Sequence, residues 1–119
     1  MNSEQFIAAM RAYGADADDT LRRFMGDADL YMDCVRLLLK DPAPHTLEHA
    51  LRARDYPAAF DAAHSIKGLA ANLGLTPLLD GTCALVEALR DKAGWDDARL
   101  AALYGEVRGQ FDRLAALMA

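Results

Sequence analysis

Alanine and leucine dominate this sequence and restrict what it can fold into. Together they supply 42 of the 119 residues, whereas valine, isoleucine and threonine supply only nine. Alanine and leucine favour helices, and β-branched residues favour strands. We therefore predict an all-α protein. A hydrophobic content of 53% can fill a core, and this length suits one domain, so we expect residues 1–119 to form a single helical bundle domain.

Glycine, proline and N-capping residues divide the chain into helical runs. Asp55 and Asp96 are typical N-caps, and Gly74 is typical of a left-handed residue that ends a helix. Because short connections make consecutive helices antiparallel, we predict an up-down-up-down four-helix bundle with one or two extra short N-terminal helices. The expected bundle helices are Ala28–Lys40, the segment His45–Leu73 taken as a broken pair, Pro77–Lys92 and Asp96–Met118.

The spacing of apolar residues predicts which face of each helix is buried. In the helix that contains His64, the residues opposite the imidazole should face the core, and they are Ala59, Ala62, Ile66, Leu69 and Leu73. In the segment Ala28–Lys40, the apolar stripe consists of Leu30, Cys34, Leu37 and Leu38. Each stripe also predicts a side of the helix that faces solvent.

The charge balance restricts the classes of partner. With 18 acidic and 13 basic residues the net charge is -5, which argues against binding to nucleic acid or to an anionic membrane surface. The longest uncharged stretch, Gly68–Leu79, is too short to span a bilayer. The N-terminus has neither a cationic start nor a long apolar run, so we expect a cytoplasmic protein without a signal peptide.

The outer face of the helix around His64 has an unusual composition. Lys67 is the only basic residue between Arg54 and Arg90. Gly68 lies in mid-helix, where glycine costs about 1 kcal/mol relative to alanine, and a glycine there suits a surface that another molecule approaches closely. The residues expected on this face with His64 are Phe60, Lys67, Gly68, Ala71 and Leu75.

An imidazole that faces solvent beside a lysine suits the capture of a phosphoryl group. Imidazole has an unperturbed pKa of about 6.5, so a large neutral fraction exists at cellular pH. The lone pair of a neutral ring nitrogen can attack phosphorus. Lys67 follows His64 by three residues, and its ammonium can therefore reach the phosphoryl oxygens.

The residues around His64 resemble a known family, the histidine-containing phosphotransfer (HPt) domain of phosphorelays. The family pattern is a histidine, two residues, Lys-Gly, five residues and a glycine. Here it reads His64-Ser65-Ile66-Lys67-Gly68-Leu69-Ala70-Ala71-Asn72-Leu73-Gly74. The resemblance covers most of the chain. Asp18–Leu39 is similar to the acidic start of the family with its Leu/Phe-rich helix. Leu51–Tyr56 is similar to the turn before the histidine helix, and Leu78–Leu89 is similar to the return helix.

The resemblance implies a role for each residue of the motif. His64 would carry the phosphoryl group on Nε2, Lys67 would steady its oxygens, and Gly68 would leave room for them. The expected partners are response-regulator receiver domains and hybrid histidine kinases, and the receiver would supply the aspartate and the Mg²⁺. The chain itself would be a monomeric phosphocarrier without a cofactor or kinase activity of its own. Its docking surface would include Phe60, Ala71 and Leu75.

Two other interpretations stay open at the level of sequence. A helical bundle could bind a receiver or a kinase without being phosphorylated. The string His45-Thr46-Leu47-Glu48-His49 matches the His-x-x-Glu-His pattern of inverted zinc peptidases, but a catalytic zinc site also needs a third ligand and a cleft. We therefore expect His45 and His49 to be solvated. The cysteines, Cys34 and Cys83, are too few for a disulfide scaffold or a zinc ribbon and should be reduced, packed thiols.

Overall fold

Helices account for most of the computed structural model, which describes residues 1–119 and contains no strand. The prediction of an all-α fold is confirmed. None of the helices combines the length and the apolarity that crossing a membrane requires. In chain order the elements are α1 (Ser3–Tyr13), α2 (Ala17–Arg23), α3 (Ala28–Leu39), α4 (Ala43–Arg52), α5 (Tyr56–Asn72), α6 (Thr76–Arg90), a 3₁₀ turn (Lys92–Gly94) and α7 (Asp97–Met118).

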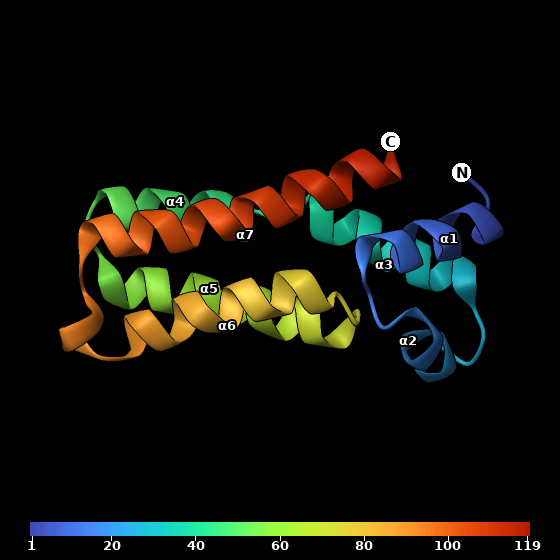
Figure 1. The fold of residues 1–119 in the computed structure, drawn as a ribbon, viewed down its shortest axis with the longest axis horizontal. Coiled ribbons are helices and arrows are strands. Elements are labelled where there is room, and N and C mark those ends of the chain that lie inside the picture. Colours follow the sequence, from blue (N-terminus) through green and yellow to red (C-terminus); the bar gives the residue numbers. More distant parts are fainter.

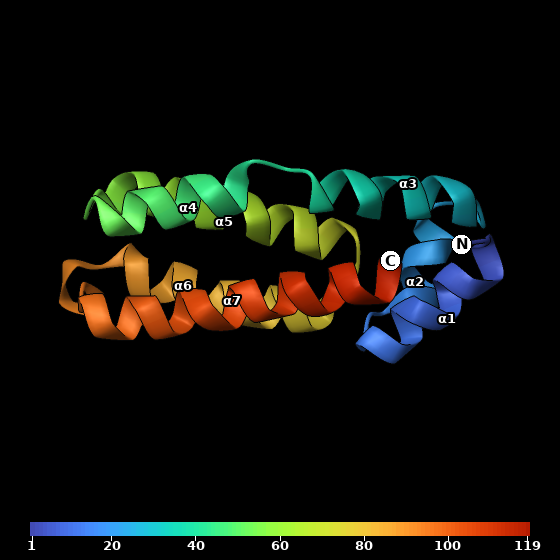
Figure 2. The same ribbon diagram turned by 90° about the horizontal axis from the view of Figure 1, so that it is seen from above.

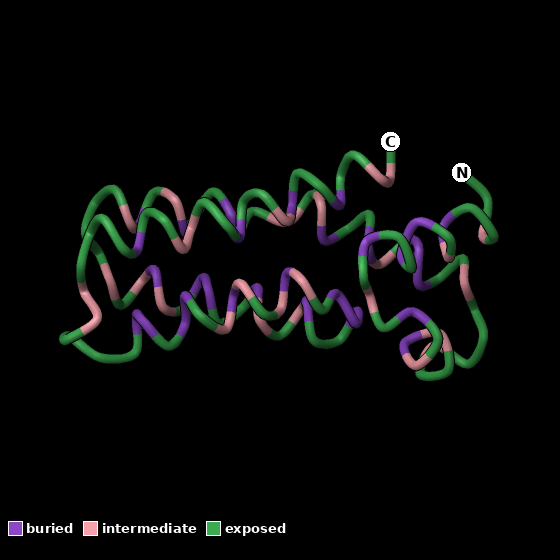
Figure 3. The backbone as a smooth tube through the Cα atoms, viewed as in Figure 1, coloured by how far each residue is buried: buried purple, intermediate pink, exposed green.

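Helices α4 to α7 pack side by side into a bundle. α5 packs against both α4 and α6, and α7 packs against α6 and α4. Figures 1 and 2 show that each of these helices runs opposite to the one before it. Buried positions line the inner sides of the bundle (Figure 3). Fully buried examples, one from each helix in order, are Leu47, Ile66, Leu85 and Leu114.

The three N-terminal helices form a cap at one end of this bundle (Figures 1 and 2). The prediction that Ala28–Lys40 is a bundle helix is therefore wrong: α3 packs against α1 and α7, and α4 and α5 are two separate bundle helices. The chain breaks between α3 and α4 at Pro42, which cannot supply the backbone donor that a continuous helix needs. The preceding Asp41 carboxylate accepts a hydrogen bond of 2.8 Å from the Ala43 backbone N–H, where α4 begins.

Aromatic rings decide which face of α3 is buried. The Tyr31 ring meets Phe6 edge-on and stacks on Phe24, with ring centroids 4.9 and 5.1 Å apart. Because these contacts turn the helix, Leu30 and Leu37 face outward and are 48% and 67% exposed. The predicted core stripe is therefore wrong for these two leucines. The residues of α3 that do face the core are Tyr31, Met32, Val35 and Leu38, with Cys34 half-buried.

The cap also holds the C-terminal end of α5. The end of a helix leaves carbonyl groups without partners inside the helix, and here three consecutive carbonyls accept hydrogen bonds from the cap. Gly74 has a left-handed φ of 64°, as predicted. The three bonds run from the Arg23 guanidinium to Asn72 (3.1 Å), from the Tyr31 hydroxyl to Leu73 (2.8 Å) and from the Asp16 backbone N–H to Gly74 (2.8 Å).

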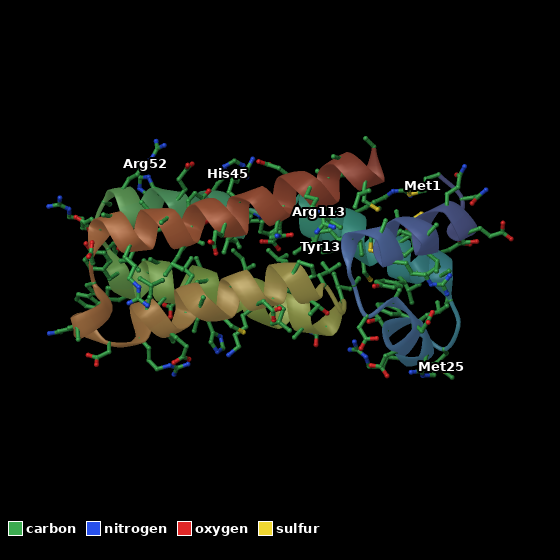
Figure 4. The ribbon with its side chains drawn as sticks, viewed as in Figure 1. Met1, Tyr13, Met25, His45, Arg52 and Arg113 are labelled. Carbon is green, nitrogen blue, oxygen red and sulfur yellow. The ribbon has the colours of Figure 1, made fainter.

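A second connection joins the cap to α7, at Arg113 (Figure 4). The Arg113 guanidinium lies 4.9 Å from the centroid of the Tyr13 ring and donates a hydrogen bond of 3.0 Å to the Ala12 carbonyl. Tyr13 is fully buried, and its hydroxyl donates a hydrogen bond to no acceptor of the protein. Burial raises the pKa of Tyr13 to about 12, although the charge of Arg113 opposes that shift.

Candidate functional site

Helix α5 presents His64 to solvent near its middle. The helix begins after Asp55, whose carboxylate accepts a hydrogen bond of 3.2 Å from the Ala58 backbone N–H, and Pro57 lies in its first turn. The imidazole side of α5 is turned away from the core, and His64 is exposed, as predicted. The buried face is mostly alanine, and its members are Ala59, Ala62, Ala63, Ile66 and Ala70.

An aromatic ring and an arginine lie beside His64. The Phe60 ring stacks on the imidazole with centroids 5.8 Å apart and planes inclined by 29°. From α6, the Arg90 guanidinium lies 5.6 Å from the Phe60 centroid and pairs with the Glu87 carboxylate at 3.2 Å. Phe60 therefore contacts both the imidazole and a cation that is itself held by a carboxylate.

Arg90 is the member of this group that the sequence analysis did not find. It belongs to a different helix from His64 and comes near the site only because α5 and α6 pack together. The signal that could have identified it is the register of an antiparallel helix pair. That register places a residue near the end of one helix beside a residue near the start of the other, which is where Arg90 and Phe60 lie.

Lys67 and Gly68 lie one turn after His64. Lys67 is half-buried and takes part in none of the ion pairs of the structure, so no carboxylate of this chain neutralises its ammonium. Gly68 is exposed, and a Cβ added there would meet no atom within 4 Å. The fold therefore does not require a glycine at position 68, and the space beside it is open to another molecule.

The residues predicted to dock a partner do not all lie on one surface. Ala71 is exposed and Phe60 is half-buried, both on the His64 side of α5. Leu75 is fully buried, so the prediction that it belongs to the outer face is wrong. The reason is that the chain leaves the helix at Gly74, and Leu75 takes the N-cap position of α6. Helical angles counted from His64 no longer apply there.

The other candidate ligands do not gather into a site. No group of three or more His, Cys, Asp or Glu side chains is arranged to hold a metal ion. His45 and His49 are both exposed on α4, and Figure 4 shows His45 on the outer side of the bundle. Cys34 and Cys83 are half-buried free thiols on α3 and α6.

The site thus combines a solvent-facing imidazole, an ammonium without a carboxylate partner and an open position in the helix. The family model of the Hpt domain matches residues 44–117. This match covers α4 to α7 and includes His64, Lys67 and Gly68, whereas α1 to α3 lie outside it. The chain matches no curated protein and no solved structure at a significant level.

Proposed function

Because the chain belongs to the Hpt domain family, we propose that it shuttles a phosphoryl group between the aspartates of receiver domains, with His64 as the phosphoacceptor. Histidine phosphotransfer in two-component phosphorelays is the function of this family. The observation that supports His64 is its exposure on α5, beside an ammonium without a carboxylate partner and the open position at Gly68. A carrier of this kind receives its phosphoryl group from a partner protein.

The proposed transfer exchanges one bond to phosphorus for another. The lone pair of neutral His64 Nε2 attacks the phosphorus of an aspartyl phosphate on a receiver, and an N–P bond forms as the P–O bond to the aspartate breaks. The electron pair of that bond leaves with the aspartate, which becomes a carboxylate. Attack by the aspartate of a second receiver reverses these steps. Nothing else is consumed, and the Mg²⁺ belongs to the receiver.

Charge and space at the site suit this group. Phosphoryl transfer requires positioning and charge stabilisation more than covalent chemistry from the protein. The Lys67 ammonium can follow the phosphoryl oxygens as a flexible point charge. The Phe60 stack restricts rotation of the imidazole, Arg90 adds positive charge on the α6 side, and Gly68 leaves room for the incoming receiver.

Further parts of the proposal concern the partners and the cell. Response-regulator receivers and a hybrid histidine kinase dock around Phe60 and Ala71, on the up-down-up-down bundle of α4 to α7. Residues 1–119 act as one domain and as a monomer in the cytoplasm, without a cofactor of their own.

The test is transfer from a receiver domain that carries a labelled aspartyl phosphate. The unaltered chain should acquire phosphate that is labile in acid and stable in alkali, and His64→Gln should acquire none. His45→Gln is a matched control, because His45 is also an exposed histidine of the bundle, and it should be labelled normally. Labelling of His64→Gln at the unaltered level contradicts the proposal, and receiver binding without any labelling identifies an interaction module instead.

A further inference from the structure

The Phe60 ring lies against the imidazole of His64. The two centroids are 5.8 Å apart and the planes are inclined by 29°, so the rings are stacked and do not meet edge-on. Both residues belong to α5 and are four positions apart, which places their side chains one turn apart on the same side of the helix. The face of a phenyl ring attracts a cation that lies within about 6 Å of its centroid. Phe60 is therefore close enough to stabilise a positive charge on this imidazole.

Phosphorylation of His64 creates such a charge. A neutral imidazole carries a proton on one ring nitrogen and a lone pair on the other. When Nε2 attacks the phosphorus of an aspartyl phosphate and Nδ1 keeps its proton, the N–P bond uses the Nε2 lone pair and the P–O bond to the aspartate breaks. The ring is left with a positive charge, and the phosphoryl oxygens remain negative. The phosphorylated side chain thus has two charged parts with opposite requirements.

The cations of the site serve only the negative part. Lys67 and Arg90 attract phosphoryl oxygens, but they repel a positively charged ring. His64 forms no ion pair with a carboxylate of this chain, and neither does it pair with Asp61, three residues before it. The Arg90 guanidinium lies 5.6 Å from the Phe60 centroid, and its pairing with Glu87 at 3.2 Å offsets part of its charge there. The Phe60 face is thus left to act on the charged imidazole.

From this arrangement we infer that Phe60 stabilises the phosphorylated form of His64 through a cation–π interaction with the charged ring. The inference rests on the proposed phosphorylation of His64 and gives Phe60 a role that is separate from contact with a receiver. A cation–π interaction at an exposed site changes an equilibrium constant about two- to fivefold. Phe60 therefore shifts the exchange of the phosphoryl group toward the chain and away from the receiver.

The experiment measures the equilibrium constant for exchange of the phosphoryl group between one receiver domain and the chain. This constant compares free reactants with free products, so weaker docking slows both directions equally and leaves it unchanged. Phe60→Leu keeps an apolar side chain without a π face, and it should lower the constant about threefold. Phe60→Tyr keeps the ring and should preserve the constant. Phe60→Trp should raise it about twofold, because tryptophan is the best aromatic partner of a cation.

Tyr56→Leu is the matched control. Tyr56 is also a half-buried aromatic residue of α5, but its ring packs against Trp95, with centroids 4.7 Å apart, and not against His64. Its loss should leave the equilibrium constant unchanged. A second measurement uses phosphoramidate, a small phosphodonor that needs no docking surface. The extent of labelling at equilibrium with phosphoramidate should show the same ratio between Phe60→Leu and the unaltered chain.

The possible failures can be told apart. If Phe60→Leu slows transfer in both directions but keeps the equilibrium constant, the inference is overturned and the proposed function stands. Equal decreases in Phe60→Leu and Tyr56→Leu also overturn the inference, because they indicate a general loss of aromatic packing on α5. If the unaltered chain exchanges phosphate with phosphoramidate but with no receiver, the proposed function fails, and the phosphoramidate ratio alone decides the inference. If neither donor labels His64, both fail.

Discussion

Gly68 and Gly74 belong to the same motif but have opposite surroundings. A Cβ added at Gly68 would meet nothing within 4 Å. A Cβ added at Gly74 would lie 2.0 Å from Thr20 Oγ1 and 3.1 Å from the Asp16 carbonyl oxygen, and the backbone there has φ of 64°. The fold requires the second glycine and does not require the first. At position 68 the proposed function uses the open space as room for the receiver, next to His64.

The same contrast applies to the middle of α5, which carries Gly68, and to its C-terminal end, which Gly74 follows. The middle of the helix presents His64 and Lys67 to the outside, with only the Phe60 ring stacked on the imidazole. At the end of the helix, the cap binds the carbonyls of Asn72, Leu73 and Gly74. Substitutions in the middle should therefore change transfer and spare stability, and substitutions at the end should do the reverse.

The largest expected effect is on stability, from Gly74→Ala. A left-handed φ costs a residue with a Cβ about 1–2 kcal/mol, and the contact with Thr20 adds to this because Thr20 is buried and β-branched. We expect a loss of about 2–4 kcal/mol in the free energy of unfolding, measured with urea. Adding Thr20→Ala should recover part of the loss beyond simple additivity. A Gly74→Ala chain as stable as the unaltered one would remove the distinction between the two glycines.

Gly68→Gln should have the next largest effect, on transfer. A side chain in the open space displaces the receiver, and a misplacement of about 1 Å can slow a reaction about 100-fold. The free energy of unfolding should rise by up to about 1 kcal/mol, because glycine is a poor helix former. Gly105→Gln on α7 is the matched control, since a Cβ there also meets nothing within 4 Å, and it should transfer normally. Normal transfer by Gly68→Gln would show that this space is not used.

Tyr31→Phe should weaken the held end of α5. The change removes the buried hydrogen bond to the Leu73 carbonyl and leaves that acceptor without a partner, which costs about 1–1.5 kcal/mol. Tyr13→Phe is the control, because the Tyr13 hydroxyl is also buried but donates to no acceptor. It should not lower the free energy of unfolding measured at pH 7. Equal losses in the two variants would mean that the contact with α5 is not what stabilises this end.

The smallest expected effect is on the pH dependence of stability. It comes from Tyr13 and Tyr31 and not from residues around His64. Burial raises the pKa of Tyr31, and it raises that of Tyr13 to about 12. The folded chain therefore keeps these protons at a pH where the unfolded chain releases them. Their contribution to stability is complete below about pH 10 and is lost as the pH rises through the folded pKa values. Urea unfolding between pH 8 and 11 should show this fall, and each Tyr→Phe variant should make it shallower; unchanged slopes would contradict it.

Local sequence patterns were sufficient for α5 and insufficient for the cap. The N-cap Asp55, the exposed His64 and the left-handed Gly74 follow from short-range rules that operate within one helix. The buried face of α3 does not, because its apolar residues allow two orientations and the choice depends on rings that pack against Tyr31 from α1 and from Phe24.

The same limit explains the two errors at the site. Leu75 lies beyond a chain reversal, where the helical period around His64 has ended, and it is buried. Arg90 reaches Phe60 across the interface of two helices, and a pattern counted along one helix cannot show this. The motif itself was found because His64, Lys67 and Gly68 lie within one and a half turns of a single helix.

The three hydrogen bonds between the end of α5 and the cap also affect how a partner protein meets His64. Hydrogen bonds to the carbonyls at the end of a helix oppose fraying, so they help to hold α5, and with it the His64 ring, in place relative to the cap. A partner protein then meets an imidazole in a defined position, and only the orientation of the partner has to be found during binding. Loosening that tether should slow productive collisions even when every group around the ring is intact.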